Sequence, residues 1–188
     1  MERVDELRAI LHGSDWFCRV LANVAALDLP DCWVGAGAVR DLVWDVRFGA
    51  GFDPADIVDV DVVFFDGGDL SAEREEQAEA ALRVADPSVK WDVKNQARVH
   101  LWFEARFGAP AEPLASAFEG VATWPERASA VAVRLDGEDE IDVLAPFGLD
   151  DLLDGVWRRN PTRVTEREWQ ARLDRKQPGR RWPAVTVV

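Results

Sequence analysis

The sequence predicts an α/β or α+β domain built around a mixed β-sheet that helices flank, with helical N- and C-terminal extensions. Three observations support this fold class. Short β-branched runs such as residues 58–65 have the length and composition of buried strands. Segments with helical spacing of apolar residues alternate with these runs. Asp136-Gly137 lies between two apolar stretches, which indicates an antiparallel hairpin within the same sheet.

The first third of the chain predicts two helices, a strand and a third helix. Apolar residues repeat at helical spacing over residues 4–11 and again over residues 17–24, and Ser14 is placed to cap the second helix. Residues 32–34 form a short apolar strand that leads into a glycine turn. A helix over residues 38–48 follows and ends at Gly49.

The middle of the chain alternates strand and helix signals. The strand at 58–65 precedes a helix that Ser71 caps and that ends at Asp86-Pro87. Apolar and charged residues alternate over residues 89–94, which is typical of a half-buried strand. A helix carrying Val99, Trp102 and Phe103 comes next, and then a short helix within residues 114–122.

The last part of the chain predicts the hairpin, further helices and an apolar tail. The hairpin strands are residues 130–135 and 140–144, and a helix carrying Leu149, Leu152 and Leu153 follows them. Thr165 is placed to cap a basic helix that runs to about Lys176. The tail at 182–188 is compatible with an edge strand.

Length and charge describe one domain with an uneven charge distribution. We expect a single domain over residues 1–188, with a core at about 30–155 and a basic helical extension at about 156–188. The extension carries nine Lys and Arg against three acids, a local charge of +6 in a chain of net charge −13. The remainder therefore carries −19, which disfavours non-specific nucleic-acid binding. The basic extension still leaves room for an RNA end or an acidic partner.

Composition also bounds the location. No apolar run approaches the length of a bilayer, so we expect no membrane partner. The first residues are too charged for a secretory signal. Cys18 and Cys32 show neither a metal-ligand spacing nor a disulfide framework, so a cytoplasmic location is the default expectation.

Asp59 and Asp61 are the main candidates for chemistry. Two carboxylates one residue apart in a strand project from the same face, where they are costly unless a cation neutralises them. Mg²⁺ typically takes one or two carboxylates together with substrate phosphates. The turn at Gly35 to Gly37 precedes the pair and offers backbone N–H groups to an anion. These parts together predict a site for a metal and a nucleoside triphosphate.

At these residues the chain resembles the nucleotidyltransferase superfamily, which includes tRNA CCA-adding enzymes and poly(A) polymerases. Ala36-Gly37-Ala38-Val39-Arg40-Asp41 followed by Asp59-Val60-Asp61 is similar to the superfamily pattern G-G-x-V-R-D and D-x-D. More closely, the chain resembles a bacterial nucleotidyltransferase-like family over nearly its whole length. The segments that carry this closer resemblance are 35–44, 59–66, 94–100, 145–152 and 159–161.

The resemblance implies a nucleotidyltransferase fold and Mg²⁺, or alternatively Mn²⁺, held by Asp59, Asp61 and a third carboxylate on a neighbouring strand. Asp142, in the second hairpin strand, is our choice for the third ligand. Asp92, between Trp91 and Val93, is its rival, and each is also explained as an ordinary outward-facing strand residue.

Further residues are candidates for binding the nucleotide. Gly35, Gly37 and Arg40 are placed to hold the triphosphate, although Arg40 is equally compatible with an ion pair to Asp41 or Asp45. Asn95 and Arg98 follow a strand end, where ligands often bind in α/β sheets, but bonds that stabilise the loop explain them as well. Ala36 departs from the pattern, since it replaces the first glycine of the pair and alanine tolerates positive φ poorly.

The predicted function is metal-dependent transfer of a nucleoside monophosphate from an NTP to an acceptor hydroxyl, with release of pyrophosphate. The acceptor class stays open among a small molecule, an RNA end and a protein. The alternative is a nucleotide-binding or protein-interaction module that keeps the fold without turnover.

Overall fold

The computed structural model describes residues 2–136 and 140–188. The predicted hairpin turn at Gly137 therefore lies outside the described residues. The strands are β1 (Trp33–Gly35), β2 (Val60–Phe64), β3 (Trp91–Asn95), β4 (Ala132–Leu135), β5 (Ile141–Leu144), β6 (Val156–Trp157) and β7 (Thr186–Val187). The α-helices are α1 (Glu2–His12), α2 (Asp15–Ala25), α3 (Ala36–Phe48), α4 (Ala72–Ala85), α5 (Val99–Phe107), α6 (Ala117–Val121), α7 (Asp150–Leu153), α8 (Glu166–Lys176) and α9 (Pro178–Arg181). Short 3₁₀ turns cover Pro54–Asp56 and Gln96–Arg98.

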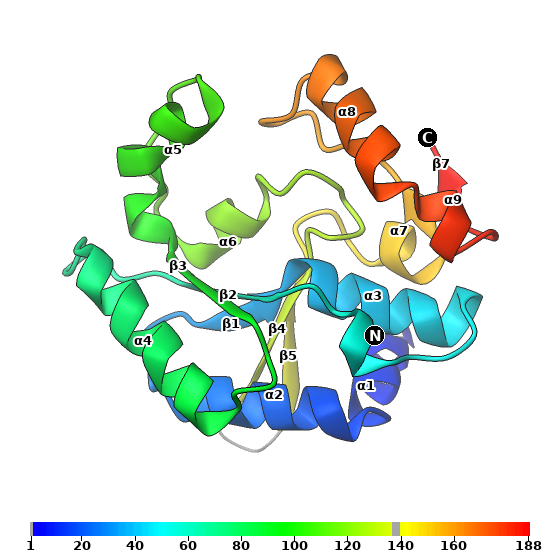
Figure 1. The fold of residues 1–188 in the computed structure, drawn as a ribbon, viewed down its shortest axis with the longest axis horizontal. Helices are drawn as coiled ribbons and strands as arrows, with labels where there is room; N and C mark the ends of the chain where they lie inside the picture. Colours follow the sequence, from blue (N-terminus) through cyan, green and yellow to red (C-terminus); the bar gives the residue numbers. More distant parts are fainter. Residues whose placement is uncertain (1, 137–139) are drawn as a thin grey trace.

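The main sheet is mixed, as the sequence predicts. Its strand order within the described residues is β3-β2-β1-β4-β5. β2 and β3 run parallel, with α4 as their crossover, and the other neighbours run antiparallel. Helices flank this sheet, and α5 and α8 lie on opposite sides of the upper part of the molecule (Figure 1). The mixed α/β fold class is confirmed.

Local capping explains where several helices begin. Ser14 Oγ accepts a hydrogen bond from the Phe17 amide at 3.3 Å and so starts α2, as predicted. Thr165 and Glu168 form a complete capping box at the start of α8. Ser71 occupies the N-cap position of α4, but its hydroxyl makes no capping hydrogen bond.

Two helices differ from their predicted bounds. α3 begins at Ala36 and not at Ala38, because the glycine turn is itself the first turn of the helix. Pro178–Arg181 forms a helical turn of its own after α8 has ended at Lys176.

The two faces of the sheet are covered differently. The larger hydrophobic cluster joins one face to α1, α2, α3 and α4. On the other face a smaller cluster forms under α6, where Trp33 and Val63 pack against Ala117 and Val121. This smaller cluster leaves the β2–β3 side of its face for the pocket described below.

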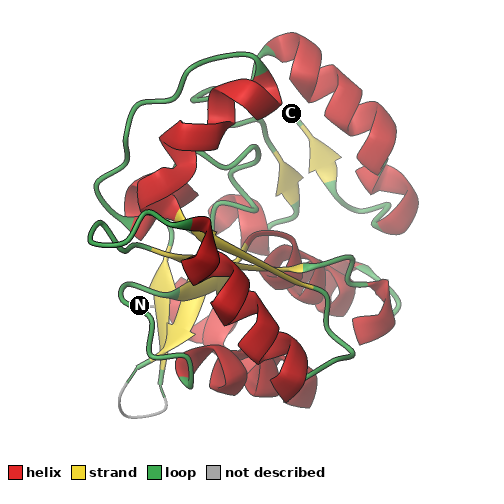
Figure 2. Cartoon of the chain, turned by 60° about the vertical axis from the view of Figure 1, so that its left-hand side comes forward, coloured by secondary structure: helices red, strands yellow, loops and turns green. Residues whose placement is uncertain are grey.

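The basic C-terminal extension packs onto α3 through tryptophans. β6 and β7 form a separate two-stranded parallel sheet (Figure 2). Trp44 of α3 meets the rings of Trp157 and Trp182 at centroid distances of 5.4 and 5.1 Å. Its Nε1 donates to the Leu152 carbonyl at 2.6 Å, so Trp44 belongs to the core.

Among the described residues, none of the helices combines the length and the apolar character needed to cross a membrane.

Candidate functional site

Asp61 lies at the centre of a row of three neighbouring strand positions. The register places Gly35 of β1 on one side of Asp61 and Asp92 of β3 on the other. Paired residues on adjacent strands project to the same face, so the carboxylates of Asp61 and Asp92 stand side by side. Asp59 precedes β2 and acts electrostatically on Asp61. We refer to Asp59, Asp61 and Asp92 as the acidic floor.

The acidic floor concentrates more negative charge than its surroundings neutralise. Burial, and then repulsion by Asp59 and Asp92, raises the pKa of Asp61 to about 7. A hydrogen bond from the Gly37 backbone amide and the positive charge of Arg40 oppose this rise only in part. A cation bound beside Asp61 would relieve the repulsion.

Two lysines flank the acidic floor, but neither neutralises the carboxylate of Asp61. Lys90 Nζ is 3.9 Å from Asp59 Oδ2, and the side chain of Lys90 is mostly exposed. Lys94 donates to Asp92. Because each lysine pairs with an outer carboxylate, the pKa of the central carboxylate, that of Asp61, stays raised.

The donor set of the acidic floor fits a hard divalent cation. Carboxylate oxygens are the ligands that Mg²⁺ prefers, usually one or two of them with phosphates and waters completing the shell. Residues 2–136 and 140–188 contain no group of three His, Cys, Asp or Glu side chains already arranged to hold a metal. The floor therefore fits a metal that arrives with a phosphate ligand better than a metal held by the protein alone.

The glycine turn is closely packed at Gly35 and open at Gly37. A Cβ at Gly35 would lie 2.7 Å from both the Trp124 ring and the Val131 carbonyl oxygen, so only glycine fits there. A Cβ at Gly37, whose amide bonds to Asp61, would meet no heavy atom within 4 Å. Between them Ala36 adopts φ +54°, the left-handed conformation that a glycine would take without strain.

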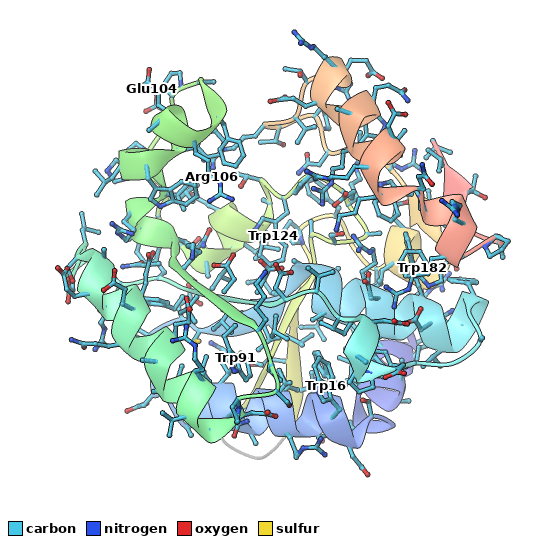
Figure 3. All side chains as sticks on the ribbon, viewed as in Figure 1. Trp16, Trp91, Glu104, Arg106, Trp124 and Trp182 are labelled. Atoms are coloured by element: carbon cyan, nitrogen blue, oxygen red, sulfur yellow. The ribbon has the colours of Figure 1, made fainter. Side chains whose placement is uncertain are left out.

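A pocket of about 560 Å³ opens above the acidic floor. Its size is in the range of small-molecule sites. Asp61, Asp92 and Lys94 line its base, α5 forms one wall, and α8 with the loop before it forms the opposite wall. Figure 3 places Trp124 between α5 and α8, with Arg106 on the inner side of α5 and Glu104 at its outer end.

The α8 side of the pocket is positively charged. Arg163, Arg172 and Arg175 line it, and Lys176 follows directly. Burial, and then repulsion by Arg40 and Arg172, lowers the pKa of Lys176. Arg163 and Arg175 have no ion-pair partner within the described ranges 2–136 and 140–188. We refer to Arg163, Arg172, Arg175 and Lys176 as the basic wall.

The basic wall is the part of the site that the sequence did not assign. Its residues belong to the extension whose local charge of +6 is visible in the sequence. That charge alone does not tell a solvated helix from a ligand-facing one. The missing information is the packing of α8, which turns Arg172 toward the buried Glu126 and into the pocket.

Asp142, our choice for the third carboxylate, is not brought to the acidic floor. It lies on β5, three strands from β2, a separation of about 14 Å. Its Oδ2 accepts two hydrogen bonds from Arg134, at 3.1 and 3.2 Å, and this ion pair satisfies it. The rival residue, Asp92, is the one that lies beside Asp61.

Arg40 is placed in a buried network and not in the pocket lining. Its guanidinium bonds to Asp41 at 2.6 and 2.9 Å and to Ser129 Oγ at 2.7 Å. It also lies over the Trp157 ring at 4.6 Å. Since these contacts occupy its donors, the structure corresponds to the alternative in which Arg40 pairs with Asp41.

Asn95 and Arg98 also stabilise loops in the structure. Asn95 is fully buried, donates to the carbonyls of Asp66 and Asp69 and accepts from backbone amides. Arg98 pairs with Glu75 at 2.7 Å. Neither residue lines the pocket, whereas their neighbour Gln96 does.

Comparison with known proteins identifies related folds. A model of a family described as "Nucleotidyltransferase" matches residues 22–187. A solved NMR structure described as revealing a CCA-adding enzyme head domain is 28% identical, with a TM-score of 0.80, and the match covers 98% of this chain and 95% of that one. Comparison with the curated proteins finds no match.

More distant matches are larger enzymes. The Thermotoga maritima CCA-adding enzyme complexed with tRNA is 16% identical over 91% of this chain, with a TM-score of 0.55. A CCA-adding enzyme complexed with CTP is 16% identical over 98% of this chain, with a TM-score of 0.59. The matches cover 38% and 43% of those two chains, so this chain spans about two fifths of their length. At this identity they show the fold alone.

The match to the family extends over most of the chain, from α2 to β7, and it includes the glycine turn, the acidic floor and the basic wall. The chain belongs to the nucleotidyltransferase family.

Proposed function

We propose that this protein is a metal-dependent nucleotidyltransferase that transfers a nucleoside monophosphate from an NTP to an acceptor hydroxyl and releases pyrophosphate. The observation that carries the proposal is that one pocket has the negatively charged acidic floor on one side and the positively charged basic wall on another. The acidic floor gains by accepting a cation, because burial, and then repulsion by Asp59 and Asp92, raises the pKa of Asp61. The basic wall gains by accepting an anion, because burial, and then repulsion by Arg40 and Arg172, lowers the pKa of Lys176. A metal–triphosphate complex carries both charges.

In this proposal Asp61, with Asp59 or Asp92 beside it, would hold Mg²⁺, or Mn²⁺ in its place, and phosphate oxygens of the nucleotide would complete the set of ligands. When bound, the metal neutralises charge on the triphosphate and on the departing pyrophosphate. Arg172 and Arg175 contact phosphate oxygens and hold the chain of phosphates in one orientation. Gly37 fixes Asp61 through its backbone amide. Positioning and charge neutralisation are the main sources of rate acceleration in phosphoryl transfer.

Calorimetric titration tests the binding half of the proposal. ATP and CTP are the first nucleotides to use, because similar folds are described in complex with them. We expect binding that needs Mg²⁺ and that Asp61→Asn weakens at least tenfold. Asp142→Asn is the matched control and retains binding, since Asp142 pairs with Arg134 outside the pocket. Binding that does not respond to Mg²⁺ or to Asp61→Asn contradicts the metal site.

Labelled NTPs test turnover. Incubation of the protein with α-labelled NTP, Mg²⁺ and fractionated cell extract is expected to label one acceptor fraction and release pyrophosphate. Asp59→Asn abolishes the labelling if the acidic floor catalyses the transfer.

A second candidate function is a nucleotide-binding module without turnover. The left-handed Ala36 favours it, because the first glycine of the pair is absent at the position where the turn needs positive φ. Mg²⁺-dependent NTP binding without labelling of any fraction supports this candidate over the enzyme, and labelling that appears only in Ala36→Gly would identify Ala36 as the cause of the lost turnover.

A further inference from the structure

We propose that the α5 wall of the pocket is a nucleobase-binding subsite, in which the base of the bound nucleotide stacks on the guanidinium of Arg163 where it lies over the Phe103 ring. The inference rests on the proposed function, since it assigns the base of the nucleotide whose phosphates the acidic floor and basic wall bind. It adds a ligand contact that neither the fold nor the D-x-D pattern assigns.

α5 presents aromatic rings to the pocket and not only to a core. Trp102, Phe103 and Phe107 all line the pocket. The centroids of Phe103 and Phe107 are 4.6 Å apart, and those of Trp102 and Phe103 are 6.2 Å apart. Val99, at the start of the helix, is buried, whereas Phe107 at its end is 51% exposed. The exposed ring of Phe107 is costly in water, and together with the half-buried rings of Trp102 and Phe103 it offers an apolar surface for a base.

Arg163 completes this surface from the opposite wall. Its guanidinium lies 4.9 Å from the centre of the Phe103 ring. Burial lowers its pKa, and within the described residues no carboxylate pairs with it. A planar guanidinium over an aromatic ring is an arrangement that stacks well on a nucleobase. The pocket therefore has a guanidinium stacked on an aromatic ring at one end and carboxylates at the other.

Chain connectivity fixes the position of α5 relative to the acidic floor. β3 carries Asp92 and Lys94, and after the 3₁₀ turn at Gln96–Arg98 the chain continues directly into α5. Its nine residues extend the wall by roughly 13 Å away from the sheet. A nucleotide with its phosphates over β2 and β3 therefore has its base beside α5.

The composition of the wall favours a base over another phosphate or a sugar. Trp102, Phe103 and Phe107 make the α5 side of the pocket largely apolar. A phosphate group gains nothing from an aromatic face, whereas every base has a π-face that stacks on it. Stacking is tolerant of base identity, so we expect the subsite to contribute affinity more than choice among the four NTPs.

Comparison of an NTP with inorganic tripolyphosphate isolates the contribution of the base. Both ligands carry the triphosphate, and only the NTP has a base, so the ratio of their dissociation constants measures the subsite. We expect the wild-type protein, in Mg²⁺, to bind ATP and CTP at least about tenfold more tightly than tripolyphosphate. Phe103→Ala is expected to weaken NTP binding roughly tenfold and to leave tripolyphosphate binding unchanged.

Conservative variants separate stacking from folding. Phe103→Tyr keeps the ring and should retain the wild-type ratio, while Arg163→Lys keeps the charge but loses the planar group and should lower the ratio. Leu101→Ala is the matched control on α5, because Leu101 is 57% exposed and does not line the pocket. Thermal unfolding of each variant shows whether it is folded.

The outcomes distinguish this inference from the proposed function. If the wild-type protein binds neither ligand, both are overturned. If it binds tripolyphosphate and NTP equally well, or if Phe103→Ala weakens both ligands to the same extent, the base subsite is overturned and the triphosphate site stands. A selective loss of NTP binding in Phe103→Ala, restored in Phe103→Tyr, supports the subsite.

Discussion

Ala36 shows how one residue strains the turn beside the candidate site. Its φ of +54° places an L-side chain in the left-handed region, which costs about 1–2 kcal/mol. Part of that cost is recovered by the helix α3, which begins at this residue and keeps Gly37 bonded to Asp61.

Ala36→Gly is expected to stabilise the protein. Glycine adopts positive φ freely, but its unfolded chain is more flexible, so the net gain should be about 0.5–1 kcal/mol. Urea unfolding measures the change. Ala38→Gly, in the same helix at an ordinary helical position, serves as the control and should destabilise. A loss of stability in Ala36→Gly would contradict the assigned strain.

Asp61 links the site to the pH dependence of stability. The folded state holds its proton up to a pKa of about 7, whereas the unfolded chain releases it near 3.8. Between these values the folded state binds more protons than the unfolded state, so stability falls as pH rises from about 4 to 7. The full penalty is present above pH 7 and amounts to at most about 4 kcal/mol.

Asp61→Asn should therefore raise the thermal midpoint at pH 8 and change it little at pH 4, in the absence of divalent metal. Differential scanning calorimetry at both pH values measures this difference. Asp142→Asn is the control and should not stabilise, because it removes a partner of Arg134. An Asp61→Asn variant that is no more stable than the wild type at pH 8 would show that the ionised Asp61 carboxylate does not destabilise the folded protein. Mg²⁺ with nucleotide should stabilise only proteins that retain Asp61.

At the scale of elements, α8 is held to the body of the protein by a buried ion pair. Glu126 is fully buried and accepts hydrogen bonds from Arg172. Burial alone would raise the pKa of Glu126, but hydrogen bonding and attraction from Arg172, with Arg40 at 4.0 Å, outweigh burial and hold that pKa below its usual value. This pair fixes the direction in which α8 presents the basic wall.

Glu126→Gln should destabilise the protein by about 3 kcal/mol, because it leaves two arginines near a neutral buried group. The variant should also weaken tripolyphosphate binding, since α8 loses its anchor. Chemical denaturation and calorimetric titration measure the two effects. Glu166→Gln, on the exposed start of α8, is the control and should change stability by less than about 0.5 kcal/mol. A Glu126→Gln variant as stable as the wild type would contradict the anchoring role of this ion pair.

Helices and strands were predictable where a capping residue or the spacing of apolar residues was sufficient to place them. The capping residues Ser14 and Thr165 and the helical spacing fixed α2 and α8 closely. The β-branched run at Val58 to Phe65 similarly indicated β2. Strand order was not predictable in this way, and this is why Asp142 and Asp92 were indistinguishable. Both alternate with apolar residues, and only the pairing of β3 with β2 places Asp92 beside Asp61.

Long-range packing decided the remaining site residues. Arg40 follows the glycine turn in sequence, but Ser129 and Glu126, almost ninety residues away, draw its guanidinium into the interior. The basic wall and the rings of α5 come from segments distant in the sequence. Local patterns therefore predicted the residues on the sheet and not those on the walls of the pocket.

At the scale of the whole molecule, the C-terminal segment is joined to α3. Arg181 binds Asp45 at 2.6 Å and Asp41 at 3.2 Å, and Trp182 Nε1 donates to Asp45 at 2.7 Å. These contacts are the reason to expect the extension at about 156–188 to unfold together with the core as one domain.

Arg181→Met should lower stability by about 2 kcal/mol at pH 7, because two buried carboxylates lose a cation. Thermal unfolding followed by tryptophan fluorescence and by circular dichroism measures both the loss and its cooperativity. Arg180→Met is the matched control, since Arg180 is exposed and, among the residues that the structure describes, its side chain bonds to Gln177 alone. Two separate transitions in the wild type would contradict a single domain.

The parallel pairing of β2 and β3 has a consequence for the register in which β3 folds onto the sheet. β3 is an edge strand, and its side chains alternate between the core and the pocket. A shift of one residue in its pairing would turn Asp92 and Lys94 into the core and bring Trp91 and Val93 out to the pocket. Burying those charges is so costly that the misaligned form cannot persist. The charges of Asp92 and Lys94 therefore also select the register of β3, because the register that assembles the acidic floor is the one that keeps these charges out of the core.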